Sequence, residues 1–141
     1  MNQWQQKMKR VISELLETMF FMPVDFESEG SAAAYGLESR VDLARKMQKI
    51  SIHLRVTAPF ARAAAANFLG ADEEQVTWSD LEDVVKEMTN MIGGSYMTQL
   101  EQDLWSLGIP VVARLGNEHE RSVDGLSISH LGEPVGLVYL C

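Results

Sequence analysis

A strict alternation of apolar and polar residues over residues 50–57 constrains the fold more than any other feature of this chain. Ile50, Ile52, Leu54 and Val56 are separated by single polar or charged residues. Because successive side chains of a β-strand point to opposite faces, this period of two predicts a strand with one buried face. Further strands are predicted at 37–43, 111–115, 126–131 and 135–140, the last two joined by a hairpin at 132–134.

Two helices are predicted in the first half of the chain. Apolar residues recur at three- and four-residue steps from Trp4 to Phe21, the spacing of an amphipathic helix that Pro23 is expected to end. Pro59 and four consecutive alanines favour a short helix over residues 60–69. Both helices precede predicted strands or loops, so helical and extended segments alternate in blocks.

A second long helix is predicted from Ser79 to Leu107, with Thr77 or Ser79 as its N-cap and Gly108 after its end. Its buried face is expected to contain Leu81, Val84, Val85, Met88, Met91, Ile92, Leu100 and Leu104. With 141 residues, 46% of them hydrophobic, the chain is sized for a single domain spanning residues 1–141. The predicted class is α+β, with two long helices packed on an antiparallel or mixed β-sheet.

Charge and composition exclude several functions. Residues 1–70 hold nine Lys or Arg and seven Asp or Glu, whereas residues 71–141 hold three and thirteen. Such an acidic second half disfavours nucleic acid and favours encounter with a basic protein surface. The sequence contains no apolar run long enough to span a membrane and no signal-like start, so a cytoplasmic location is expected. The three histidines and the single terminal cysteine have no metal-ligand spacing, so no metal site is predicted.

The candidate site is a polar stripe on the second long helix. Asp83, Glu87, Asn90 and Gly94 follow one another at three- and four-residue steps, so their side chains are expected on one helix face. Glycines cost about 1 kcal/mol each in a helix interior, so Gly93 and Gly94 together imply a close approach. That approach is either packing between the two long helices or docking of a partner.

The residue types at the centre of this stripe suit phosphoryl transfer. The Asn90 amide is both donor and acceptor, so it can hold a water molecule while contacting a phosphoryl oxygen, but it cannot accept a proton. Glu87 can act as a general base or pair with a cation on the surface that receives the helix. The chain has no phosphate-binding glycine loop of its own. The phosphoryl group and any metal are therefore expected from a partner.

The first long helix repeats this spacing. Ser13, Glu17 and Phe20 repeat the separations of Asp83, Glu87 and Asn90, seventy residues earlier. Two similar halves would pack as a pseudo-symmetric pair of helices. An amide is present at the last position only in the second copy.

Asp83, Glu87 and Asn90, followed by Met91-Ile92-Gly93-Gly94, resemble the signature of the CheC/CheX/FliY family of chemotaxis phosphatases. Members of this family carry Asp or Ser, then Glu four residues later and Asn three after that. CheC-type members have two working copies and CheX-type members only the second, so the chain is most similar to the CheX-like domain. The similarity in organisation covers most of the chain.

The resemblance implies a protein aspartyl-phosphate phosphatase, a hydrolase of two-component signalling. Its substrate would be a phosphorylated CheY-like receiver domain, into whose active site the second long helix is inserted. Glu87 and Asn90 would be the catalytic residues, with Asn90 orienting the attacking water and Glu87 bridging to the receiver's lysine. Asp83 and Gly94 would face the partner. No cofactor is expected on this chain, because the receiver would bind the Mg²⁺, and a homodimer formed through the sheet is implied.

Two alternatives remain open at the level of sequence. The same helix could dock on a regulator or scaffold without catalysis, so that Glu87 and Asn90 would be contact residues only in a binding or adaptor domain. A sensor domain that binds a small ligand between sheet and helices is the other alternative, although the sequence shows no pocket chemistry for it.

Overall fold

The computed structural model describes residues 2–27, 33–100, 104–116 and 125–141. These ranges form three α-helices and one 3₁₀ turn, namely α1 (Gln3–Met19), α2 (Ala58–Leu69), η1 (Glu73–Gln75) and α3 (Trp78–Thr98). The strands are β1 (Asp25–Glu27), β2 (Tyr35–Arg45), β3 (Gln48–Thr57), β4 (Ser106–Leu107), β5 (Val111–Arg114), β6 (Leu126–His130) and β7 (Glu133–Leu140). The predicted α+β class is confirmed; the short strands β1 and β4 and the turn η1 were not expected.

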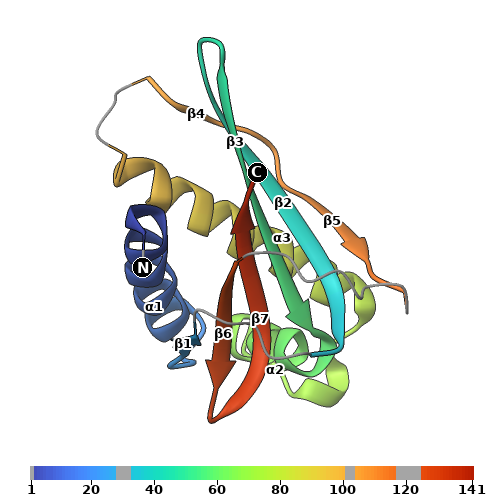
Figure 1. Cartoon of the computed structure of the whole chain (residues 1–141). Helices are drawn as coiled ribbons and strands as arrows, with labels where there is room; N and C mark the ends of the chain where they lie inside the picture. The colour runs from blue at the N-terminus through green and yellow to red at the C-terminus, as the bar shows by residue number, and fades with distance from the viewer. Residues whose placement is uncertain (1, 28–32, 101–103, 117–124) are drawn as a thin grey trace.

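All strands pair antiparallel in one sheet, in the order β1-β6-β7-β3-β2-β4, with β5 beside β4 along the same edge of β2. The hairpin between β6 and β7 turns at Leu131 and Gly132, both of which have positive φ angles, of 53° and 82°. Two positive φ angles are the geometry of the tight hairpin turn that suits the twist of paired strands. The hairpin predicted at this place is therefore present (Figure 1).

The core lies between one face of the sheet and the helices. Leu37, Val41 and Leu43 of β2 lie beside Val56, Ile52 and Ile50 of β3 in the ladder, and their side chains point to the helical layer. Helix α3 contacts β2, β3, β4 and β5, while α1 and α2 pack against α3. In Figure 1 the helices lie behind and beside the sheet, and the other face of the sheet is turned to the viewer. Within the described ranges no helix is both long and apolar enough to cross a membrane.

The second long helix ends much earlier than Leu107, so this part of the sequence prediction is wrong. Helix α3 ends at Thr98, where the Gln99 amide donates to the Tyr96 carbonyl in a tighter turn. Residues 101–103 lie outside the described residues. Leu104, expected on the buried face, is 79% exposed and has a φ angle of +76° that no α-helix accommodates. Residues 106–107 pair with β2 as strand β4, and this pairing takes the place of the predicted helix.

The structure does not establish the predicted symmetry between the two long helices, and it contains α2 as a third helix. Phe20 is the C-cap of α1 and is fully buried, with its ring stacked on Phe68 at a centroid distance of 5.1 Å. Asn90, in contrast, lies in the middle of α3 and is half-buried. The two positions therefore differ in both helix location and burial, and the pseudo-symmetric relation of the helices stays a prediction.

Helix α3 lies against the sheet at a glycine. A Cβ atom added to Gly93 would lie 2.7 Å from Val41 Cγ1 and 3.0 Å from Leu107 Cδ1. Real Cβ atoms are not found so close to a neighbour, so only glycine permits this approach of helix to strand. Gly94 differs, since in the described part of the chain a Cβ added there would meet Leu107 Cδ2 at an ordinary 3.8 Å. Gly93 therefore permits close packing of α3 on β2 and β4, and not the packing between two long helices that was one of the alternatives.

We expect substitution of these neighbouring glycines to have opposite effects on stability. Alanine improves intrinsic helix propensity equally at both positions, by about 1 kcal/mol. Gly93→Ala also forces Val41 or the helix to move, which typically costs about 1–3 kcal/mol. Urea denaturation should therefore give Gly94→Ala a free energy of unfolding equal to or above that of the parent, and Gly93→Ala a lower one. Equal stabilities for the two variants would contradict the close packing at Gly93.

Candidate functional site on helix α3

The start of α3 is fixed by local hydrogen bonds. Thr77 is the N-cap, and its hydroxyl accepts from the Asp80 amide at 3.1 Å while the Asp80 carboxylate accepts from the Thr77 amide at 3.0 Å. This reciprocal capping box satisfies two amides that the first turn of a helix leaves without partners. The helix then continues for 21 residues and buries one face, made of Leu81, Val84, Val85, Met88, Thr89, Ile92, Gly93 and Tyr96.

The predicted site residues lie on the opposite, solvent-facing side of α3. Asp83 and Glu87 are exposed, and Asn90 and Gly94 are half-buried. Their three- and four-residue spacing on a continuous helix brings all four to one stripe. The Asp83 carboxylate lies 3.9 Å from the Lys86 ammonium, a loose and exposed ion pair. In the part of the chain that the structure describes, Glu87 and Asn90 have no hydrogen bond or ion pair through their side chains, which are therefore available to a partner.

This stripe can orient a water molecule but contains no nucleophile and no metal-binding cluster. The Asn90 amide can donate through nitrogen and accept through oxygen, and Glu87 offers a carboxylate on the same face. Among the described residues no group of three or more His, Cys, Asp or Glu side chains could hold a metal ion. The stripe is therefore suited to completing a site on another molecule.

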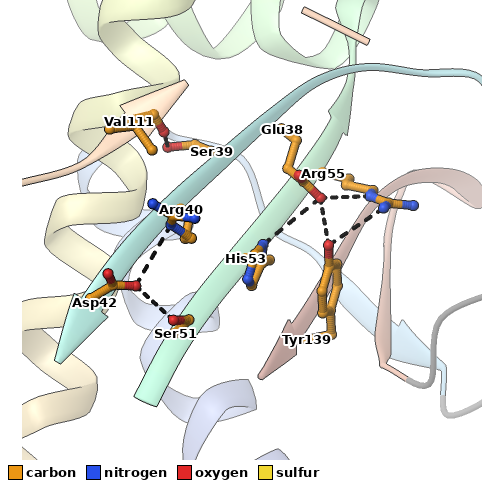
Figure 2. A network of polar contacts seen from close by, with 9 residues as sticks. All are labelled: Glu38, Ser39, Arg40, Asp42, Ser51, His53, Arg55, Val111 and Tyr139. Carbon is orange, nitrogen blue, oxygen red and sulfur yellow. Dashed lines mark hydrogen bonds and ion pairs between the residues drawn. The ribbon is translucent and has the colours of Figure 1, made fainter. Parts of the chain in front are cut away.

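A second polar cluster lies on the face of the sheet away from the helices, and Figure 2 shows it. The Glu38 carboxylate accepts from Arg55 Nε at 2.8 Å and from the Tyr139 hydroxyl at 2.6 Å. The His53 ring stacks on Tyr139 at 4.5 Å, with its Nδ1 atom 3.9 Å from Glu38 Oε1. These four side chains come from β2, β3 and β7, so the cluster ties the three central strands together. We refer to Glu38, His53, Arg55 and Tyr139 as the Glu38 network.

Burial and charge shift the pKa values in this network in different directions. Burial alone would raise the pKa of Glu38, but the hydrogen bonds from Tyr139 and Arg55 and the charge of Arg55 together lower it. Burial lowers the pKa of His53 and outweighs the neighbouring Glu38 carboxylate, which acts in the opposite direction. Burial, followed by the hydrogen bond to Glu38, raises the pKa of Tyr139 to about 12. All three shifts favour the state with ionised Glu38, neutral His53 and neutral Tyr139 near neutral pH.

Sequence reasoning assigned no role to His53 and did not find the Glu38 network. Its members lie at outward-facing positions of three strands, and only strand register brings them together. Glu38 is paired with Arg55, and His53 with Tyr139. The alternation in 50–57 predicted that His53 and Arg55 share a face. It contained no information on which strands lie alongside β3.

Residues 39–130, which include the whole stripe, match the family model described as "Chemotaxis phosphatase CheX". The chain belongs to the CheX family. This confirms the resemblance predicted from Asp83, Glu87 and Asn90. A search of curated proteins found no match.

Solved structures share the CheX fold over nearly the whole chain. The chemotaxis protein CheX from Vibrio vulnificus superposes with a TM-score of 0.78 at 16% identity, covering 99% of this chain and 96% of that one. CheX from Desulfovibrio desulfuricans gives a TM-score of 0.73 at 18% identity, covering 98% and 97%. A complex of CheX with CheY, BeF₃ and Mg²⁺ from Borrelia burgdorferi gives 0.75 at 15% identity, covering 99% and 97%. At sequence identities of 15% to 18%, these superpositions establish the fold alone.

From the Glu38 network we expect the free energy of unfolding to decrease in acid, and part of this decrease to depend on His53. The pKa of His53 lies below its ordinary 6.5 in the folded chain, so the unfolded chain binds the proton first. The associated stability is present above pH 6.5 and is lost as the pH falls through the lowered pKa. The free energy of unfolding should therefore decrease below pH 6.5, by no more than about 1.4 kcal/mol per pH unit from this one proton.

The measurement is urea denaturation of the parent and of His53→Gln at several pH values between 4.5 and 7.5. The variant should show a shallower loss of stability between pH 6.5 and 4.5, above the range in which Glu38 contributes through its own lowered pKa. His130→Gln makes the same change on β6, outside the network, and is the matched control. If the free energy of unfolding falls with pH equally in the parent and in His53→Gln, His53 is not the source of the pH dependence.

Proposed function

We propose that this chain is a hydrolase that removes the aspartyl phosphate of a CheY-like response regulator in two-component signalling. The proposal rests on Glu87 and Asn90, which lie three residues apart on the exposed face of α3 in a member of the CheX family. Within the described chain their side chains have no partners. The CheX–CheY complex from Borrelia burgdorferi supports a receiver domain as the partner. A cytoplasmic location accompanies such a partner.

In the proposed reaction α3 is inserted into the receiver's active site, with the stripe facing the phosphorylated aspartate. The Asn90 amide holds a water molecule in line with the bond to be broken. The water oxygen forms a bond to phosphorus as the bond between phosphorus and the aspartyl oxygen breaks. The products are inorganic phosphate, which retains the proton released by water, and the free receiver carboxylate. Mg²⁺ is held by the receiver, and this chain supplies no cofactor.

The remaining stripe residues contribute to docking in this proposal. Glu87 pairs with the lysine of the receiver's active site, which places the helix. Asp83 adds a second negative charge one turn earlier, and Gly94 leaves space for the receiver at the other end of the stripe. Gly94 is suited to this because, among the described residues beyond its own stretch of helix backbone, Leu107 alone lies within 4 Å of a Cβ added there.

A homodimer formed through the sheet is part of the same proposal. Within the described residues β5 pairs only with β2, so its outer edge is unpaired. Exposed apolar side chains lie at its start, with Ile109, two residues before β5, 89% exposed and Val111, its first residue, 48% exposed. Exposed apolar edge strands are templates for pairing with another chain, which supports a second copy there.

Asn90→Ala is expected to remove the acceleration of dephosphorylation while leaving the fold intact. The half-buried Asn90 side chain has no described partner in the free chain, so its loss should change stability by less than about 0.5 kcal/mol. Loss of an oriented water should lower kcat by at least about a hundredfold. The measurement is phosphate release from a phosphorylated receiver. Gln6→Ala, which removes an exposed amide from α1, should retain the full rate.

Glu87→Gln separates the two roles open to this carboxylate. If Glu87 pairs with the receiver's lysine, the variant should raise KM about tenfold with little change in kcat, because an exposed helix-surface charge acts in docking. A general base would instead show a fall in kcat and a changed pH profile, and this outcome would contradict the pairing role. Receiver binding by the parent protein without any change in the rate of dephosphorylation would select the binding-domain alternative.

A further inference from the structure

We propose that Arg114 is a positioning residue for α3, holding the first turns of the helix so that Glu87 is presented correctly to the receiver. This inference rests on the proposed function, because it concerns how the docking helix is oriented. Arg114 lies at the end of β5, far from the stripe in sequence. Neither the family signature nor the sequence analysis singled it out.

Strand register places the Arg114 side chain in the helical layer. Arg114 is paired with Leu37 of β2, and Leu37 is fully buried beneath the helices. Paired residues of neighbouring strands point to the same face of a sheet, so Arg114 rises from the edge strand toward α3. Val112, two residues earlier, also packs against the core, as the same alternation requires.

The Arg114 guanidinium contacts the helix at two points one turn apart. Its Nη2 atom donates to Glu82 Oε1 at 2.8 Å. Its central carbon lies 4.8 Å from the centre of the Trp78 ring. Trp78 is the first residue of α3, and Glu82 follows it by four positions, on the same side of the helix. We call Arg114 with Trp78 and Glu82 the Arg114 brace.

The segment that leads into α3 is held from the other side by α2. Arg62 donates to the carbonyl oxygens of Glu73 and Val76, immediately before the Thr77 cap. The beginning of α3 is therefore held by cations from two different elements. Of these two, Arg114 contacts side chains of the helix itself, Glu82 through a hydrogen bond and Trp78 through its ring, and so can influence the orientation of the helix directly.

The Arg114 brace holds the N-terminal end of α3. The close contact at Gly93, nearer the C-terminal end, acts as a pivot. With a rise of 1.5 Å per residue, Glu87 lies about 9 Å along the helix from Gly93, and Asn90 about 4.5 Å. A tilt about Gly93 therefore displaces Glu87 about twice as far as Asn90. Loss of the brace should consequently affect the step that depends on Glu87, which is docking, more than the step that depends on Asn90.

The strength of the brace sets the size of the expected effect. Arg114 and Glu82 have side chains 56% and 30% exposed, so their ion pair is screened by water. Exposed ion pairs and exposed cation–π contacts each change an equilibrium by up to about fivefold. The brace should therefore change the orientation equilibrium of α3 about three- to tenfold and should leave global folding nearly unchanged.

A charge swap tests the brace. Arg114→Glu and Glu82→Arg each place like charges together, whereas the double variant restores the pair in reverse. We expect each single variant to raise KM for the phosphorylated receiver three- to tenfold with kcat within twofold of the parent. The double variant should return KM to within threefold. Arg10→Glu makes the same charge change at an exposed position of α1 and should leave both constants unchanged.

Amide hydrogen exchange in the free protein provides a readout that needs no receiver. Exchange at residues 79–87 should accelerate three- to tenfold in each single variant and recover in the double variant. Unchanged exchange and KM in the single variants would overturn the inference. A double variant no better than the single ones would also overturn it, and would mean that Arg114 contacts the receiver directly. If the parent does not accelerate dephosphorylation, the proposed function fails, and the exchange data still decide the brace.

Discussion

The contact between Gly93 and Val41 is the constraint on which the arrangement of α3 depends. A helix with any side chain at position 93 could not lie so close to β2, since a Cβ atom would be 2.7 Å from Val41 Cγ1. Contact at Gly93 sets the rotation of α3 about its own axis, and the stripe of Asp83, Glu87 and Asn90 then lies on the part of the helix turned away from its buried face. The orientation of the candidate site is thus determined by the packing of the same helix on the sheet.

The two faces of the sheet make different contributions to the structure. The helical face carries the core and supports α3, and the other face carries the Glu38 network, which joins three central strands through hydrogen bonds and ring stacking (Figure 2). These half-buried hydrogen bonds favour one strand register over others, because a slip would separate the Glu38 carboxylate from Arg55 and Tyr139. A rigid sheet in turn gives α3 a fixed base, and the Arg114 brace connects the edge of that base to the start of the helix.

The sequence predicted those features that depend on local periodicity. The alternation in 50–57 located β3, and the spacing from Asp83 to Gly94 placed the stripe on one helix and led to the CheX family. Features that depend on long-range pairing were missed or wrong. The helix predicted to Leu107 ends at Thr98 because β4 pairs with β2, and the members of the Glu38 network and Arg114 meet their partners only through strand register. Local patterns do not encode which strands become neighbours.

The most direct test of the account is the rate at which phosphate is lost from a phosphorylated receiver when this protein is present at one tenth of the receiver's concentration. Receivers from the same cell should be compared with and without the protein. The account predicts that at least one receiver loses its phosphate faster, with several turnovers per molecule of this chain. An unchanged rate of phosphate loss for every receiver would contradict the proposal that α3 presents a catalytic pair.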